Sequence, residues 1–118
     1  MSLYEKYGGF GQINKVVMAF YDSLLDSDEL GPYFDDVEMP KLIDHQTKFM
    51  ADLLGGPASF SDDHLQKAHV KLNVTHEHFD ELKVILHKTL LDHKVEIEDA
   101  NLVLEAVEAR RSFIVRDT

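Results

Sequence analysis

The chain has 118 residues, of which 44% are hydrophobic and 29% charged, and its formal net charge is −10. These values are typical of one small globular domain with a single core, so we expect one domain over residues 1–118. The acidic balance argues against nucleic acid, because phosphate binding needs a basic face, and against docking on an anionic membrane surface. Because the charge favours solubility, we expect a monomer.

Cysteine is absent from the sequence. Its absence excludes disulfides, thiolate catalysis and cysteine-based zinc sites, and it suits a reducing compartment. The N-terminal stretch has no basic segment followed by an apolar run, and no apolar run is long enough to cross a bilayer. We therefore expect a cytoplasmic protein without a signal peptide or a membrane span. Seven histidines and no tryptophan are the unusual feature of the composition.

Helical signals dominate the first half of the chain. A glycine-rich break at residues 7–11 follows a very short helix. Apolar residues then recur over residues 13–25 with the spacing of a core-facing helix. A short turn or helical piece at residues 30–34 contains a Gly-Pro pair. The next helix has Pro40 in its first turn and stops at Gly55, which begins a Gly-Gly-Pro run.

The second half predicts three more helices. Ser61 and the acids after it are typical of the start of a short helix, which carries His69 on its apolar stripe. Thr75 suits the cap of a longer helix that runs to about Lys94, and a last helix begins near Glu98. The β-branched pieces between these helices are too short to make a sheet. The fold class is therefore all-α.

Two histidines, His45 and His69, occupy apolar stripes of different helices. Neutral imidazole is the commonest metal ligand. A zinc or di-iron site needs three or four convergent ligands, and no inward Glu-x-x-His pair is found on the stripes. A haem needs only one protein ligand, because the porphyrin supplies four nitrogens. An axial histidine in an apolar cleft therefore suits this sequence better than a bare ion.

Tyr21 and Gln46 also lie on inner helix faces. A buried hydroxyl or amide has to be hydrogen-bonded, and a bond to a backbone carbonyl is the plain structural explanation for the tyrosine. A second explanation is functional. Oxygen bound to ferrous iron carries partial negative charge, and a hydroxyl and an amide aimed at it in a dry pocket would stabilise it.

In these features the chain resembles the group I truncated haemoglobins, the two-over-two globins. Four motifs come in the family's order: LYEKYGGFGQI, VVMAFYDSLLDSDELGPYF, MPKLIDHQTKFMADLLGGP and LQKAHVKLNVTHEHFDEL. The resemblance covers nearly the whole chain. It implies a truncated globin fold, a two-over-two helical sandwich around haem.

The resemblance also implies a role for each matching residue. His69 matches the proximal ligand of the haem iron. Tyr21 matches the distal tyrosine that hydrogen-bonds the bound ligand, and Gln46 matches the glutamine that helps it. Phe34 matches the phenylalanine that packs on the haem plane. Leu42 occupies the position where many longer globins have a distal histidine.

His45 has two possible roles under the same resemblance. Many members have a lysine there that meets a haem propionate. Some cyanobacterial members instead have a histidine in the same His-Gln pair, and it binds the iron as a sixth ligand. His45 is therefore expected either to coordinate the iron opposite His69 or to contact a propionate at the mouth of the pocket.

Further residues are expected to line the haem slot or to pack in the core beside it: Phe49, Met50, Phe60, Leu65, Val70, Val74, Phe79, Leu86 and Phe113. His78 matches a histidine near the haem edge. Some cyanobacterial relatives bond a histidine of the last helix to a haem vinyl group, but this chain has no histidine after His93. We therefore expect non-covalent haem b.

Two functions follow. The first is a haem protein that binds diatomic ligands (O2, NO and CO). Nitric oxide dioxygenation, in which oxygen and nitric oxide become nitrate, would follow from oxygen binding and needs an external reductase. The second is a six-coordinate His45/His69 haem for electron transfer or redox defence, with weak peroxidase activity. A haem-free helical interaction domain ranks last, because it requires four polar side chains to face inward by accident.

Overall fold

The computed structural model describes residues 2–55 and 74–115. The helices in these ranges are α1 (Leu3–Lys6), α2 (Gly9–Asp26), the 3-10 helix η1 (Gly31–Phe34), α3 (Met39–Leu53), α5 (His76–Asp92), α6 (Ile97–Glu108) and α7 (Arg111–Ile114). Between described residues, β pairing is limited to a single parallel bridge that joins Val74 to Val115. The all-α prediction is confirmed. The helices of these two ranges are too short or too polar to span a bilayer.

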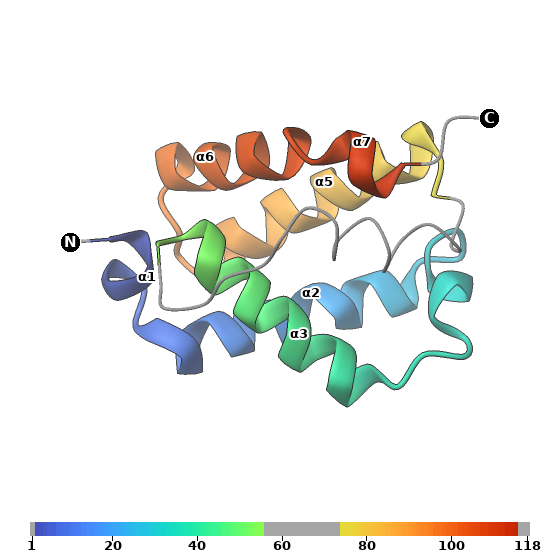
Figure 1. Ribbon diagram of the computed structural model, residues 1–118, viewed down its shortest axis with the longest axis horizontal. Helices are drawn as coiled ribbons and strands as arrows, with labels where there is room; N and C mark the ends of the chain where they lie inside the picture. The colour runs from blue at the N-terminus through green and yellow to red at the C-terminus, as the bar shows by residue number, and fades with distance from the viewer. Residues whose placement is uncertain (1, 56–73, 116–118) are drawn as a thin grey trace.

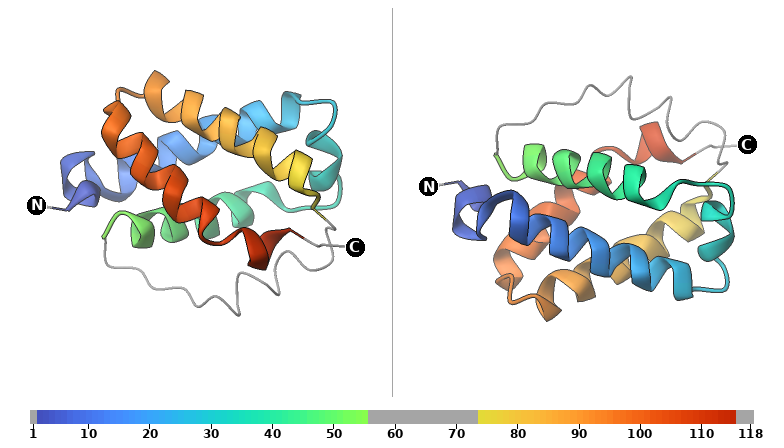
Figure 2. Two further views of the ribbon diagram at one scale, coloured as in Figure 1. Left: turned by 90° about the horizontal axis from the view of Figure 1, so that it is seen from above. Right: turned by 90° about the horizontal axis from the view of Figure 1, so that it is seen from below.

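The four long helices form two antiparallel pairs. Helices α2 and α3 lie side by side and run in opposite directions, as do α5 and α6, and the second pair lies across the first (Figures 1 and 2). Helix α2 joins the two pairs, because it packs against both α3 and α5. The short α1 packs on the start of α2, and η1 packs on its other end. This is the two-over-two arrangement.

The predicted break after the first short helix is present. Ser2 caps α1 and forms a reciprocal capping box with Glu5. Gly8 and Gly9 then have φ angles of 92° and 75°, in the left-handed region that glycine adopts without a steric cost. A Cβ on Gly8 would lie 2.6 Å from the side chain of Gln12, so the turn into α2 needs glycine for space as well.

The predicted ends of α3 are also confirmed. Pro40 lies in its first turn, where a missing N–H costs no hydrogen bond. Gly55 follows the helix with φ of 87°, which ends it as the glycine signal predicted.

Helix α5 begins as predicted, with the side chain of Thr75 accepting a hydrogen bond from the His78 amide at 3.1 Å. It ends at Asp92, close to the predicted Lys94. The prediction of one last helix is only partly right, because α6 ends at Glu108 and α7 follows as a separate turn. The sequence has no glycine or proline at this break, so helical periodicity gave no sign of it.

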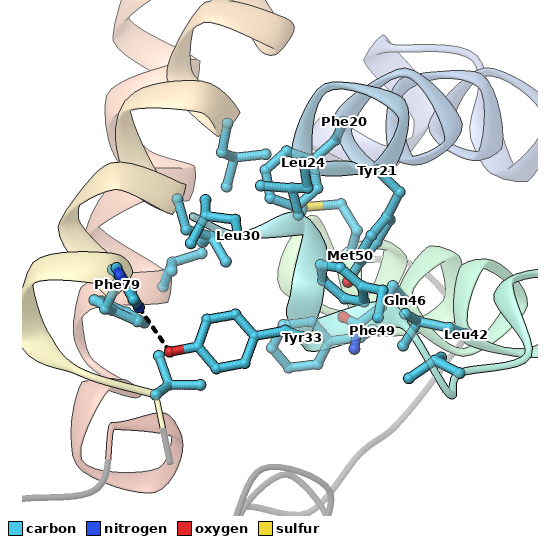
Figure 3. A pocket seen from close by; sticks show the side chains of 17 residues that line it. Phe20, Tyr21, Leu24, Leu30, Tyr33, Leu42, Gln46, Phe49, Met50 and Phe79 are labelled. Atoms are coloured by element: carbon cyan, nitrogen blue, oxygen red, sulfur yellow. Dashed lines mark hydrogen bonds between the residues drawn. The ribbon is translucent and has the colours of Figure 1, made fainter. Parts of the chain in front are cut away.

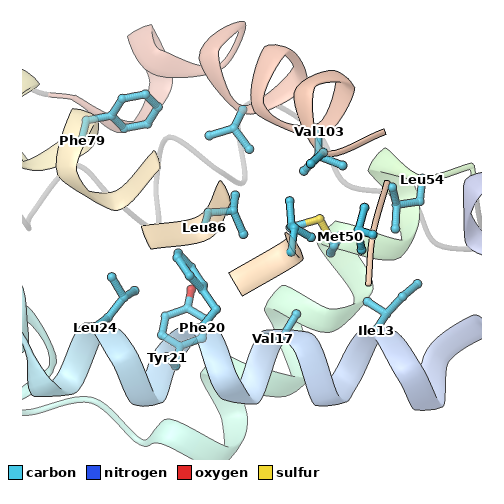
Figure 4. Packing of buried hydrophobic residues seen from close by; sticks show 14 of the residues in the cluster. Ile13, Val17, Phe20, Tyr21, Leu24, Met50, Leu54, Phe79, Leu86 and Val103 are labelled. Carbon is cyan, nitrogen blue, oxygen red and sulfur yellow. The ribbon is translucent and has the colours of Figure 1, made fainter. Parts of the chain in front are cut away.

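The core fills the space between the two helix pairs (Figure 4). Its members come from every long helix: Ile13, Val17, Phe20, Tyr21, Leu24, Met50, Leu54, Phe79, Leu86 and Val103. Leu24 and Phe79 are completely buried. The predicted inner face of α2 is therefore confirmed. The short helix predicted after Ser61 lies outside the described residues.

Candidate functional site

A cavity of about 270 Å³ opens between α2, η1, α3 and α5 (Figure 3). Its wall is mostly aromatic and aliphatic. The structure brings together in this wall the following predicted site residues: Tyr21, Phe34, Leu42, Gln46, Phe49, Met50, Val74, His78, Phe79 and Leu86. Residues that are more than fifty positions apart in the sequence therefore share one apolar pocket.

Tyr21 places a buried hydroxyl at this cavity. Its ring packs edge-on against Phe20 at 5.2 Å and against Phe34 at 5.6 Å between ring centroids. Burial raises the pKa of its phenol above the ordinary value, so the hydroxyl stays protonated at neutral pH. Burial is the only cause of this shift, and no hydrogen bond to another side chain contributes to it. The hydroxyl is therefore a donor available to a molecule in the cavity.

Gln46 reaches the cavity from α3. It shares one face of that helix with Leu42 and Phe49, because their spacings of four and three residues place side chains together. Its side chain and that of Tyr21 point into the same pocket from different helices (Figure 3). An amide and a phenol thus form two donors in a mostly apolar part of the wall.

The expectation that His45 lies on the apolar face of α3 is wrong. Its side chain is exposed and outside the cavity wall. The buried neighbour is Thr47, which sequence reasoning missed. Thr47 Oγ1 donates to the Ile43 carbonyl at 2.7 Å and accepts from Asn14 Nδ2 at 3.1 Å. Because a threonine can satisfy its hydroxyl on its own helix, α3 can turn this position toward α2.

Several predicted residues are not placed. His69, Phe60, Leu65 and Val70 lie outside the described residues, and so does the side chain of Phe113. Their roles stay predictions.

Tyr33 is a wall residue that sequence reasoning missed. Its hydroxyl lies 2.7 Å from His78 Nδ1, the bond drawn dashed in Figure 3. The two rings meet edge-on at 5.5 Å. The other ring nitrogen, His78 Nε2, lies 3.7 Å from a carboxylate oxygen of Glu29. The sequence signal that could have identified Tyr33 is its position directly before Phe34, a residue predicted to contact the cofactor.

The donor set of this pocket fits a haem better than a bare ion. In residues 2–55 and 74–115 no three or more His, Cys, Asp or Glu side chains converge on a possible metal position. The wall instead offers mostly aromatic and aliphatic surface, with the Tyr21 phenol and the Gln46 amide as donors. A haem requires apolar surface around its flat macrocycle and hydrogen-bond donors beside the ligand at its centre, and this wall has both.

Comparison with known proteins agrees with this geometry. The family model of bacterial-like globins matches residues 2–115. The group 1 truncated haemoglobin GlbN of Synechocystis is 34% identical over 93 residues, which are 75% of each chain.

Two solved structures are similar to this chain. The Fe(III) form of truncated haemoglobin from Tetrahymena pyriformis has a TM-score of 0.89 and 27% identity, over 99% of this chain and 100% of that one. The two-over-two haemoglobin of Synechococcus, solved in the cyanomet state with covalently attached haem, has a TM-score of 0.85 and 29% identity. The match covers 98% of this chain and 100% of that one.

These matches confirm the predicted resemblance and the two-over-two fold. They also support the predicted haem cofactor at the level of the family, because truncated haemoglobins carry haem. The chain belongs to the bacterial-like globin family, as a truncated haemoglobin of the two-over-two type.

Proposed function

We propose that this protein binds haem b non-covalently and uses it to bind the diatomic gases O2, NO and CO. The observation that carries the proposal is that Tyr21, a buried residue whose phenol pKa is shifted by burial alone, lines the same apolar cavity as Gln46. A phenol and an amide that meet at an apolar cavity can both hydrogen-bond a ligand held there, so they point to a ligand site.

The chain's own residues have distinct tasks in this proposal. The haem would supply an iron to which the gas binds, and His69 is proposed to hold that iron from the proximal side. Tyr21 and Gln46 donate hydrogen bonds to the gas molecule. The aliphatic and aromatic wall excludes water, which strengthens both bonds because the local dielectric constant is low. Phe34 and Phe49 offer flat surface for the macrocycle.

The attachment of the haem is proposed to differ from that in the Synechococcus relative, whose haem is covalently attached. In this chain no histidine follows His93, so the last helix offers no imidazole for such a bond. Extraction into acidified butanone tests this directly. We expect all haem to leave the protein, and haem retained on the chain would contradict non-covalent binding.

Oxygen binding leads to a proposed reaction, nitric oxide dioxygenation. Tyr21 and Gln46 would hold the oxygen while nitric oxide enters the cavity, and an external reductase would return the iron to its ferrous state. Turnover with a ferredoxin or flavin reductase should give one nitrate per nitric oxide consumed. Oxygen binding without nitrate formation would leave the protein a gas-binding protein only.

The alternative is a six-coordinate haem held by His45 and His69. The exposed side chain of His45, outside the cavity wall, favours a contact with a propionate at the mouth instead. A shift of α3 would have to precede iron coordination, and its cost lowers the population of that state.

Absorption spectra of the haem-loaded protein test both assignments. A Soret band that forms at one haem per chain supports haem binding, and no band refutes it. His69→Ala should lose or loosen the haem, whereas His87→Ala, at a half-buried position of α5 outside the cavity wall, should not. His45→Leu should leave the spectrum high-spin if His45 meets a propionate. A low-spin spectrum that turns high-spin in His45→Leu would instead establish the six-coordinate state.

A further inference from the structure

The polar groups of the cavity wall fall into two kinds. Tyr21 and Gln46 form the first kind, and the pKa of the Tyr21 phenol is shifted by burial alone, without a hydrogen bond to a side chain. Tyr33 and His78 are bonded to one another at 2.7 Å, and His78 continues to Glu29. Within the described residues, this is a connection of one hydrogen bond and one ion-pair distance that leads from the cavity wall to an exposed carboxylate.

Solvent exposure increases along this connection. Tyr33 is half-buried in the cavity wall, the His78 side chain is 27% exposed, and the Glu29 side chain is 64% exposed. The gap of 3.7 Å between His78 Nε2 and Glu29 is longer than a hydrogen bond, but an exposed glutamate closes it by a small side-chain rotation.

A second carboxyl lies at the outer end. Glu81 is in hydrogen-bonding contact with Glu29 and near Ser27, and its pKa is raised, first by burial and then by Glu29. The charge of His78 acts in the opposite direction. A neighbouring carboxylate disfavours the charged form of a carboxyl, so Glu81 holds a proton more readily than an isolated glutamate. The titratable groups that face His78 are therefore Tyr33, Glu29 and Glu81.

We propose that Tyr33 and His78 form a proton-transfer chain between the cavity and the surface carboxylates Glu29 and Glu81. It would serve ligands that are weak acids, such as hydrogen peroxide, which bind iron after losing a proton. The idea rests on the proposed haem site, and it adds a route for protons that Tyr21 and Gln46 do not provide.

The transfer balances without an added oxidant or reductant. The ligand gives its proton to Tyr33 Oη while the Tyr33 hydroxyl gives its own to His78 Nδ1. The proton on His78 Nε2 then moves to the Glu29 carboxylate. Tyr33 ends unchanged, the ligand becomes an anion and Glu29 becomes a carboxylic acid. The imidazole ends as its other tautomer and resets by exchange with water at its exposed edge.

Cyanide association tests the chain in the ferric, haem-loaded protein, because hydrogen cyanide is a weak acid that binds as an anion. Stopped-flow rates from about pH 5 to pH 9 should fall by about 10²-fold in Tyr33→Phe, the lower end of general acid–base effects. His78→Gln should give a similar loss and remove the pH dependence. Its amide can still accept from Tyr33 but cannot pass on a proton, so a merely structural role predicts wild-type rates.

Matched controls remove the same groups elsewhere. Tyr4→Phe deletes a hydroxyl outside the cavity wall, and His87→Gln changes a histidine on the same helix that contacts Asn101. Both should bind cyanide at the wild-type rate. Wild-type rates in His78→Gln across the whole pH range, with an unchanged Soret spectrum, would overturn the proposal.

Nitrogen NMR of the haem-free protein gives an independent readout. We expect His78 to carry its proton on Nε2, with Nδ1 accepting from Tyr33, and we expect Tyr33→Phe to shift the Nδ1 resonance. An unshifted resonance would also overturn the chain. A protein that takes up no haem would refute the proposed function, whereas normal haem uptake with unchanged cyanide rates would refute only the proton chain.

Discussion

The ring of Tyr21 packs edge-on against Phe20 and Phe34, and the residue lines the cavity. The ring contacts hold the oxygen in place, since a displacement of the ring would lose both favourable edge-on contacts. Gln46, a half-buried residue of α3, is held less tightly. We therefore expect Tyr21 to contribute more than Gln46 to holding a bound gas molecule.

The first prediction concerns Tyr21→Phe in the haem-loaded protein. The change keeps the ring and removes one hydrogen bond to a partly charged ligand, worth about 1.5–3 kcal/mol. Oxygen should leave about 10- to 150-fold faster, as measured by stopped-flow with CO replacement. Tyr4→Phe is the matched control, and an unchanged release rate in Tyr21→Phe would contradict its role.

Among single residues, the sequence predicted Tyr21 and Gln46 correctly as cavity residues, because each lies on a regular apolar stripe. It placed His45 wrongly and missed Thr47. Both errors come from one cause: a stripe one residue wide leaves the rotation of a helix uncertain by about 100°, and contact with α2 decides it.

The elements are held at their ends by local signals. Thr75 caps α5 directly before the turn that carries His78 and Phe79. Gly55 ends α3 directly after the turn that carries Ala51 and Leu54. Each signal therefore sets the residue at which a cavity-lining helix begins or ends.

The second prediction concerns Thr75→Ala. The His78 amide would lose its side-chain acceptor, so the free energy of unfolding should fall by about 1 kcal/mol. Urea unfolding measures this loss. Ser23→Ala, at an exposed position inside α2, should change the stability by less than about 0.5 kcal/mol. Equal effects of the two changes would show that the cap contributes nothing.

The third prediction concerns Gly55→Ala. The residue has φ of 87°, and a Cβ there would lie 3.2 Å from the Ser2 side chain. The left-handed conformation costs a non-glycine residue about 1–2 kcal/mol, so unfolding should need less urea. Gly11→Ala is a control in which the same substitution should raise the stability. Its Cβ would meet nothing within 4 Å, so we expect a gain of about 0.5 kcal/mol.

At the scale of the whole molecule, one charged cluster joins three helices. Arg111 of α7 pairs with Glu108 of α6 at 2.6 Å and with Asp80 of α5, and its guanidinium lies 4.6 Å from the Phe79 ring centroid. Lys83 of α5 lies 2.7 Å from Glu108. The cluster holds α7 against the end of α5 that carries Phe79, a buried residue of the cavity wall.

The fourth prediction concerns the pH dependence of stability. Arg111, and then Lys83, lower the pKa of Glu108 from 4.5 to about 2. A carboxyl with a lowered pKa stabilises the fold above its unfolded pKa, and this contribution is lost as the pH falls through the folded value. Glu108→Gln should therefore be less stable than the wild type at about pH 6, and the difference should disappear toward about pH 2.

Urea unfolding at several pH values checks this. Glu105→Gln, an exposed carboxylate on the same helix, is the control and should follow the wild type. A constant difference between Glu108→Gln and the wild type at every pH would show that packing, not charge, explains the effect.

The sequence by itself determined the helical class, the break after α1, both ends of α3, the start of α5 and the inner face of α2. These features depend on neighbours within a few residues: glycine at positive φ, a capping threonine and apolar spacing. It also identified Tyr21, Gln46 and most of the described cavity wall, because the motifs that carry the family resemblance include them.

The tertiary structure alone decided the rotation of α3, the break between α6 and α7, and the pairing of Tyr33 with His78 and Glu29. Each of these depends on residues far apart in the chain. Thr47 is buried because Asn14 of α2 meets it, and Arg111 is held by Asp80 of α5. Tyr33 hydrogen-bonds the imidazole of His78, which is 45 positions away in the sequence. Local spacing contains no information on such contacts, since they form only when the two helix pairs cross.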